Sequence, residues 1–198
     1  MERLLLGTRN KGKIMELKGL LSDLSGIEIL TFEDVPFFEV AETGETFLDN
    51  ALLKAESIVK ETGLPVLAED AGLEVFSLAG APGVRSARYA GEGHDYSANN
   101  ALLLKRLQGV DDRRARFITV AVLLLPDLQV FVTTGILPGT IAHAPAGEGG
   151  FGYDPLFIPA GASRTLAELS LVEKNRISHR MRAMRRMRPI IRDLTAQG

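Results

Sequence analysis

The segment from Gly7 to Lys13 combines glycines, an asparagine and lysines in a pattern suited to binding a phosphate group. It follows the apolar run Leu4–Leu6 and precedes a helical pattern, so backbone N–H groups and a helix N-terminus should face the turn. A P-loop would continue with a serine or threonine that binds magnesium, whereas this chain has Ile14. Any magnesium that accompanies the phosphate must therefore be held by other residues.

Two adjacent carboxylates, Glu69 and Asp70, follow an apolar strand pattern, and the ends of such strands are where open α/β sheets bind ligands. Neighbours along a strand point to opposite faces, so we expect one acid to line the site and the other to orient a lysine or a helix. Oxygen ligands suit magnesium, and a carboxylate beside a bound metal can position or deprotonate a water. A purely structural interpretation, in which the acids cap the next segment, is the alternative.

A second group of charged residues surrounds Thr46, a plausible helix N-cap. Asp49 stands at the third position of that helix, where it completes a capping pattern. Capping does not explain Glu42, which lies in an acidic loop, or Lys54 within the helix. Glu42 and Lys54 are therefore left without a structural explanation in this segment.

Two later segments are suited to binding a nucleotide base. In the run from Gly149 to Pro155, glycines flank two aromatic residues, and the missing side chains would let a planar base approach closely. The run from Lys174 to Arg180 is basic and suits phosphate or base-edge contacts. The alternatives are a tight loop whose Phe151 fills core and, for the arginines after Arg180, a solvated helix face.

The composition limits the classes of protein. A chain of 198 residues with 45% hydrophobic and 24% charged residues is typical of a soluble globular protein, and we interpret residues 1–198 as a single domain. A net charge of −2 argues against nucleic acid as a partner, and no apolar run is long enough for a membrane span. The absence of cysteine excludes disulfides and thiolate chemistry. We expect a cytoplasmic protein.

Hydrophobic periodicity predicts the elements that must position these residues. Strands are expected over 3–7, 27–31, from 66 into the acidic pair, and over 115–125, 130–135 and 136–142. Helices are expected over 11–24, 46–61, 96–108, from the Ser170/Glu173 capping box, and from 178 onward, where Pro189 should kink or interrupt the helix. Early alternation of strands and helices, followed by a β-meander with a hairpin, favours an α/β fold with a mixed central β-sheet flanked by helices.

Taken together, these segments resemble the inosine triphosphate pyrophosphatase family. The matching motifs run nearly the whole length of the chain: Thr8-Arg9-Asn10-Lys11-Gly12-Lys13, Glu42-Thr43-Gly44, Thr46-Phe47, Asn50-Ala51 through Lys54-Ala55, Glu69-Asp70-Ala71-Gly72-Leu73, Gly80-Ala81-Pro82-Gly83, Ser86-Ala87-Arg88-Tyr89, Gly149 to Pro155, and Ser178-His179-Arg180. Each motif is modest in specificity, but their order and spacing together are specific.

The resemblance implies magnesium-dependent hydrolysis of ITP, dITP and XTP to the monophosphate and pyrophosphate. It also implies a homodimer and an elongated, two-lobed α/β fold with a cleft between the lobes. By position, Asp70 is the proton acceptor and a metal ligand. Glu42 is our preferred second metal carboxylate, with Glu69 and Asp49 as alternatives. The implied substrate-binding residues are Thr8, Arg9, Asn10, Lys11, Gly12, Lys13, Lys54, Ala71, Phe151, Gly152, Tyr153, Asp154, Lys174, His179 and Arg180.

This chain departs from the family pattern in its acidic motif. Glu-Asp-Ala-Gly stands where bacterial relatives often have Asp-Asp-Ser-Gly, so any substrate contact of Ala71 would use its backbone N–H. Two rival functions are a pyrophosphatase for modified pyrimidine nucleotides and a nucleotide-binding module without turnover.

Overall fold

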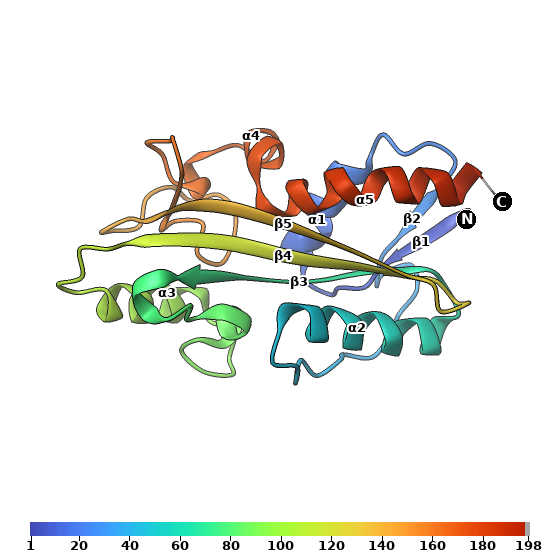
Figure 1. The fold of residues 1–198 in the computed structure, drawn as a ribbon, viewed down its shortest axis with the longest axis horizontal. Coiled ribbons are helices and arrows are strands. Elements are labelled where there is room, and N and C mark those ends of the chain that lie inside the picture. Colours follow the sequence, from blue (N-terminus) through green and yellow to red (C-terminus); the bar gives the residue numbers. More distant parts are fainter. Residues whose placement is uncertain (197–198) are drawn as a thin grey trace. The chain divides into compact units, whose positions relative to one another are not determined.

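The computed structural model describes residues 1–196 and contains eleven regular helices and strands with three short 3-10 helices (Figure 1). In chain order they are β1 (Arg3–Leu6), α1 (Lys11–Leu21), β2 (Glu28–Leu30), α2 (Phe47–Thr62), β3 (Val66–Val75), η1 (Phe76–Leu78), η2 (Gly83–Arg88), α3 (Tyr96–Arg106), β4 (Arg114–Leu124), β5 (Val130–Ile141), β6 (Phe157–Pro159), η3 (Leu166–Glu168), α4 (Leu171–Ile177) and α5 (His179–Ala196).

The strands form one mixed six-stranded sheet in the order β2-β1-β3-β4-β5-β6. β1 runs parallel to both β2 and β3, whereas β5 and β6 are antiparallel. The predicted mixed α/β fold is thus confirmed. Within the described residues, no helix is both long and apolar enough to cross a membrane.

The chain divides into two compact units. The first comprises residues 1–70, 119–135 and the segment from Arg180 onward, and the second comprises residues 71–118 and 136–179. β3, β4 and β5 each contribute residues to both units.

In the first unit, helices cover both faces of the sheet (Figure 1). Consecutive strand residues point to opposite sides, and an apolar run such as Leu4–Leu6 therefore needs packing partners on both. Leu4 and Leu6 pack in a core with residues of α1 and α5, whereas Leu5 packs in the core formed with α2. The chain start is joined to α5, since the terminal amine of Met1 donates to the carbonyl of Leu194 at 2.7 Å.

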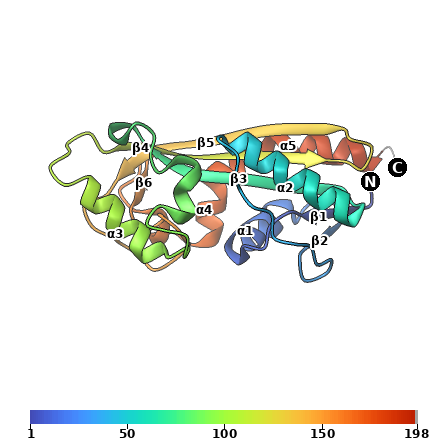
Figure 2. The ribbon, with the colours of Figure 1, turned by 90° about the horizontal axis from the view of Figure 1, so that it is seen from below.

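In the second unit, the core joins β3, β4, β5 and β6 to α3 and η3 (Figure 2, left). Its buried residues include Leu73, Leu103, Phe117, Phe157 and Leu166. Phe117 and Phe157 have ring centroids 4.7 Å apart, in the distance range of favourable aromatic pairs. This core supports the glycine-rich loop and α4.

One strand prediction was wrong, and one short strand, β6, was not predicted. Residues 136–142 were expected to form a separate strand after Gly135, but β5 continues through them to Ile141. Alternate positions from Thr133 to Ile141 are buried, and Gly135 is one of them, so the two-residue period of a strand runs through the glycine. The short strand β6 had no strand pattern of its own, and its pairing partner is the end of β5.

The helix at the end of the chain also differs in detail. α5 runs from His179 to Ala196 with Pro189 inside it, so the proline does not interrupt the helix. The predicted apolar stripe is confirmed, because Met184, Met187 and Ile191 are buried in the core and Leu194 packs against it. Core packing of this stripe offsets the hydrogen bond that the proline cannot donate.

Candidate active site

The turn between β1 and α1 is held by its own polar side chains. The side chain of Asn10 caps α1 by accepting a hydrogen bond from the N–H of Lys13 at 3.1 Å. The hydroxyl of Thr8 accepts from the N–H of Asn10 at 3.2 Å. A Cβ at Gly7 would lie 2.8 Å from a methyl of Val66, so only glycine lets the turn pass this close to β3.

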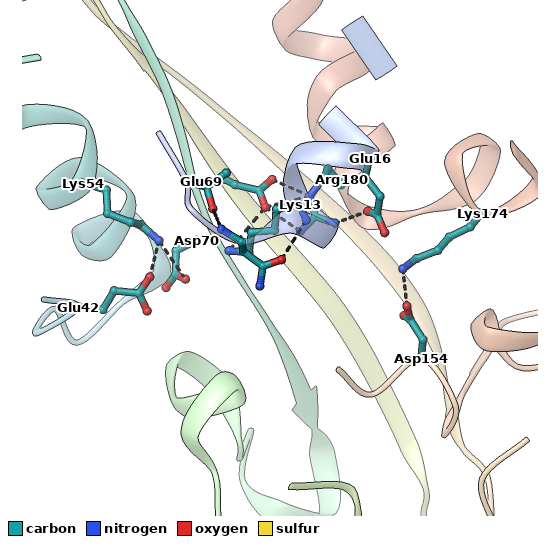
Figure 3. A network of polar contacts seen from close by, with 11 residues as sticks. Lys13, Glu16, Glu42, Lys54, Glu69, Asp70, Asp154, Lys174 and Arg180 are labelled. Carbon is teal, nitrogen blue, oxygen red and sulfur yellow. Dashed lines mark hydrogen bonds and ion pairs between the residues drawn. The ribbon is translucent and has the colours of Figure 1, made fainter. Parts of the chain in front are cut away.

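The two acids of β3 are both buried, with 1% of Glu69 and 4% of Asp70 exposed. They are adjacent in the strand, and their carboxylates contact different cations, as alternation along a strand predicts (Figure 3). Glu69 thus has a lysine, Lys13, among its contacts, which is one of the two partners expected for the second acid of the pair.

Glu69 is bound by the guanidinium of Arg180. The Nε of Arg180 donates to both carboxylate oxygens at 2.9 Å, and its Nη2 donates to Oε1 at 2.6 Å. The Nη1 of Arg180 donates to Glu16, and the ammonium of Lys13 lies 3.6 Å from Glu69 (Figure 3). Burial alone would raise the pKa of Glu69, but the charges of Arg180 and Lys13 outweigh it and hold this pKa below its ordinary value.

Lys13 thereby lies among charges of both signs. Burial and the nearby ammonium of Lys54 lower the pKa of Lys13, while Glu69 and Asp70 act in the opposite direction. Figure 3 shows Lys13 and Asp70 in the same network of charged side chains. The predicted association of the phosphate turn with the acidic pair is found within the first unit.

Asp70 contacts two residues of α2. The ammonium of Lys54 lies 3.5 Å from its Oδ1, and the side-chain amide of Asn50 donates to its Oδ2 at 3.1 Å. Lys54 also donates to Oε1 of Glu42 at 2.6 Å, so one ammonium lies between two carboxylates (Figure 3). Burial raises the pKa of Asp70, and Lys54 and Lys13 oppose that rise.

The residues around Lys54 also fit a divalent cation. A positive charge already stands between Glu42 and Asp70, whose oxygens are the ligand type that magnesium prefers. No group of three or more acidic or histidine side chains is arranged to hold a metal within residues 1–196. Magnesium usually completes its coordination with water and substrate phosphates, so two protein carboxylates are a sufficient set.

Asp49 and Glu69, the other two candidates for the second metal carboxylate, have other partners. The carboxylate of Asp49 accepts from the N–H of Thr46 at 3.0 Å and completes the capping box of α2. The carboxylate of Glu69 is bound to Arg180. Of the three candidates for a second metal carboxylate, the geometry favours Glu42.

The second unit holds the residues proposed to contact a base. Asp154 and Lys174 are buried and form an ion pair, and the N–H of Phe151 donates to the Oδ2 of Asp154 at 2.9 Å (Figure 3). The ammonium of Lys174 is 4.9 Å from the ring centroid of Phe151, within the range of a cation–π contact. The carbonyl of Gly152 accepts from Asn100 at 3.0 Å.

Two other predicted residues of this unit are packed against protein groups. The ring of His179 stacks on Phe117 with centroids 4.7 Å apart and an interplanar angle of 11°. Tyr153 is 3% exposed and its hydroxyl donates to the carbonyl of Ser86 at 2.9 Å. Any contact of Tyr153 with a substrate would therefore involve its backbone. Ala71 follows Asp70 in β3 and is half-buried.

Two residues of the turn between β1 and α1, Arg9 and Lys11, are exposed. The guanidinium of Arg9 lies 4.4 Å from the ring centroid of Phe32 and 3.8 Å from Glu39, and both charged groups are exposed. Lys11 is exposed at the start of α1. Lys13 is the lysine of this turn whose ammonium meets the buried acids.

Sequence reasoning gave no role to Glu16 and Asn50, although both are buried polar residues of this network. Glu16 follows Lys13 by three positions and stands beside Leu17 on the buried face of α1. An acid within an apolar helix stripe, on the same face as a lysine of the turn, was the available signal. Asn50 belonged to a recognised motif, but nothing in the sequence showed what it contacts.

The chain is similar to known proteins over nearly its whole length. A relative from Streptomyces coelicolor named dITP/XTP pyrophosphatase is 49% identical over 199 residues, covering 98% of this chain and 99% of the relative. A HAM1 protein structure from Coxiella burnetii has a TM-score of 0.88 at 38% identity, covering 98% of this chain and all of that one. The crystal structure of a nucleoside-triphosphatase and dITP/XTP pyrophosphatase from Mycobacterium abscessus has a TM-score of 0.75 at 45% identity, covering 96% and 100%.

The model of the Ham1 family matches residues 4–190, which include the phosphate turn, both buried acids and the glycine-rich loop. The chain therefore belongs to the Ham1 family.

Proposed function

We propose that this protein hydrolyses non-standard purine nucleoside triphosphates, namely dITP and XTP, to the monophosphate and pyrophosphate. Relatives with these named substrates, alike over nearly the full chain, support the proposal. The observation that carries the chemistry is the pair formed by the buried Asp70 and the half-buried Glu42 around Lys54, together with Lys13 of the turn between β1 and α1. We extend the proposal to ITP, which carries the same base as dITP.

We propose that Asp70 and Glu42 hold Mg²⁺ together with the substrate phosphates. When bound, this ion would neutralise charge on the triphosphate and favour the ionised form of a nearby water. Hard carboxylate oxygens and an ammonium that already balances them support this assignment.

The charged residues of the first unit suit hydrolysis at a phosphate ester. Phosphoryl and nucleotidyl transfer need charge neutralisation and alignment more than covalent help. Lys13 and Lys54 would bind the phosphate oxygens, and the turn from Thr8 to Lys13 would contribute backbone N–H groups. Asp70 would orient the attacking water and accept its proton, and burial raises its pKa toward the range in which a carboxylate is an effective base.

We assign the base to a surface formed by Phe151 and Gly152, with Lys174, His179 and Arg180 as the candidate donors. Inosine and xanthine present a carbonyl acceptor at the six-position, whereas adenine presents an amino donor. Donors arranged for a carbonyl would be left unpaired by adenine, and unpaired polar groups can discriminate by about 10⁴-fold. We also propose a homodimer, on the basis of the family resemblance. A single functional domain over 1–198 and a cytoplasmic location are proposals based on the length and hydrophobic pattern of the sequence.

A nucleotide panel tests the proposed function. Pyrophosphate release with Mg²⁺ would be measured for dITP, XTP, ITP, dATP, dGTP and dUTP. We expect kcat/KM for dITP and XTP to exceed that for dATP by at least about 100-fold. Equal values for all six nucleotides would reject base selection. A preference for dUTP would favour a pyrimidine nucleotide pyrophosphatase. Binding without pyrophosphate release would indicate a nucleotide-binding module without turnover.

A further inference from the structure

We infer that Asn50 is a positioning residue that fixes the carboxylate of Asp70 and the loop carrying Glu42 relative to each other. The inference rests on the proposed function, because it concerns the two acids assigned there to magnesium and to proton transfer. Asn50 lies in the first turn of α2, and all three residues belong to the first unit.

The side-chain amide of Asn50 forms one hydrogen bond in each direction. Its Nδ2 donates to Oδ2 of Asp70 at 3.1 Å, and its Oδ1 accepts from the backbone N–H of Gly44 at 2.8 Å. An amide supplies a donor and an acceptor in one planar group, which a carboxylate of the same size cannot do. One side chain therefore links β3 to the loop before α2.

The loop is closely packed at the point where Asn50 holds it. A Cβ at Gly44 would lie 2.5 Å from the Cβ of Asp49 and 2.8 Å from the Oδ1 of Asn50. Such distances exclude any side chain without movement of the loop, so glycine permits the hydrogen bond. Glu42 is two residues before this anchored position.

Lys54 makes a parallel link four residues later on the same face of α2. Asn50 joins the backbone of the loop to Asp70, while Lys54 joins the carboxylate of Glu42 to Asp70. The lysine is mobile about four single bonds and carries the charge, whereas the asparagine is completely buried and short. The rigid link is thus Asn50, and it would keep its geometry when the charges around Lys54 rearrange on binding a cation.

Burying the polar side chain of Asn50 is unfavourable unless its hydrogen bonds are made, and it gives packing no advantage over an apolar side chain. Asn50 is 0% exposed beside Ala51 and Ala55, which belong to an apolar core. A buried polar group is tolerated when its hydrogen bonds are made, yet an apolar residue of the same shape would serve packing alone equally well. What an apolar residue could not do is orient a carboxylate, and misplacing a reacting group by about 1 Å can reduce a rate by about 100-fold.

Two isosteric variants separate the links. Asn50→Asp keeps the acceptor for Gly44 but loses the donor to Asp70, and Asn50→Leu loses both. Steady-state kcat and KM for dITP would be measured at saturating Mg²⁺, together with the melting temperature of each variant. Hydrogen exchange of the Gly44 amide would be followed by NMR in protein free of metal and nucleotide. We expect kcat to fall by about 100-fold in both variants, with KM changed less than about threefold. The Gly44 amide should exchange faster in Asn50→Leu and remain protected in Asn50→Asp.

The matched control is Gly63→Ala at the other end of α2. Gly63 has φ +66°, and a Cβ there would meet nothing within 4 Å, so alanine strains the helix end without touching the network. This variant should lose melting temperature and retain kcat. If the Asn50 variants do not fold, Gly44→Ala tests the same link from the loop and should give the same loss of kcat.

The outcomes distinguish the inference from the proposed function. A folded Asn50→Asp protein with kcat near that of an active wild type overturns the inference alone. A kcat loss in Gly63→Ala equal to that in the Asn50 variants, or an unchanged Gly44 amide in Asn50→Leu, overturns it as well. A wild-type protein that releases no pyrophosphate from dITP, XTP or ITP overturns the proposed function and, with it, a positioning role in catalysis.

Discussion

Glu69 and Asp70 are neighbours in β3, and their carboxylates are bound by different cations, Arg180 for the first and Lys54 for the second. Because neighbouring strand residues point to opposite faces, one acid contacts Arg180 and the other is placed beside Lys54. Glu69 is committed to a buried network that holds Arg180 and Lys13, while Asp70 faces the lysine that it shares with Glu42. Disturbing the two acids should consequently have different effects.

Glu69 should contribute to stability in a pH-dependent way. Its folded-state pKa is below the ordinary value of 4.5, so the unfolded state binds more protons and stability falls as the pH drops from about 4.5 through the folded-state pKa. In Glu69→Gln this dependence should be reduced, and the free energy of unfolding at pH 7 should fall by about 3 kcal/mol because buried cations lose a partner. Urea unfolding between pH 3 and pH 7 measures both effects.

The control for Glu69 is Glu28→Gln. Glu28 forms an exposed ion pair with Arg3 in which more than half of each side chain is accessible. Exposed pairs contribute between about 0 and 1 kcal/mol, so this variant should follow the wild-type pH curve. Equal loss of stability in both variants would contradict the role given to Glu69.

The lysines of the phosphate turn should not be equivalent. Lys13 points to the buried acids, whereas Lys11 is exposed at the start of α1. Lys13→Ala should raise KM for dITP by at least about tenfold, because a desolvated charge interacts more strongly with phosphate than an exposed one. Lys11→Ala should change KM less than about threefold under screening by salt. The reverse order would show that Lys11 makes the decisive phosphate contact.

Removal of metal should stop turnover and leave the fold intact. Without a divalent cation, Lys54 and Asn50 still pair with the carboxylates, so no buried acid loses all its partners. Adding excess EDTA to the nucleotide-free protein should change the melting temperature by less than about 2 °C, while pyrophosphate release ceases and returns with Mg²⁺. A large drop in melting temperature would indicate a structural metal instead.

Asp154 should affect both stability and substrate binding in the second unit. It is buried against Lys174, and its Oδ2 also accepts from the N–H of Phe151. Asp154→Ala removes the buried carboxylate partner of the Lys174 ammonium, which should cost about 3 to 5 kcal/mol, and removes the acceptor of the Phe151 N–H. We expect reduced stability in urea and a KM for dITP increased by about tenfold or more. An exposed acid, Asp111→Asn, serves as the control and should change neither.

Much of this arrangement was predictable because local rules and tertiary packing agree. The Thr46 and Ser170 caps, the apolar stripe of α5 and the alternation of Glu69 and Asp70 follow from short-range patterns that the structure confirms. The course of β5 through Gly135 was not predicted, because a glycine reads as a break until its neighbours show that it is buried in a sheet.

The long-range partners of polar residues could not be predicted from the sequence. Arg180 contacts Glu16 and Glu69, which are separated from it by 164 and 111 positions. Side-chain pairing over such separations depends on the folded topology and not on any local pattern. Arg9 illustrates the same point, since its neighbours in the motif suggested phosphate binding and its side chain lies over Phe32.

The most direct test of the account is the hydrolysis of dITP by the wild type and by Asp70→Asn, followed by ³¹P NMR with Mg²⁺ present. We predict that the wild type produces the monophosphate and pyrophosphate, and that Asp70→Asn, with a melting temperature close to that of the wild type, is slower by at least about 1,000-fold. Turnover by Asp70→Asn near the wild-type rate, or release of orthophosphate in place of pyrophosphate by the wild type, would contradict it.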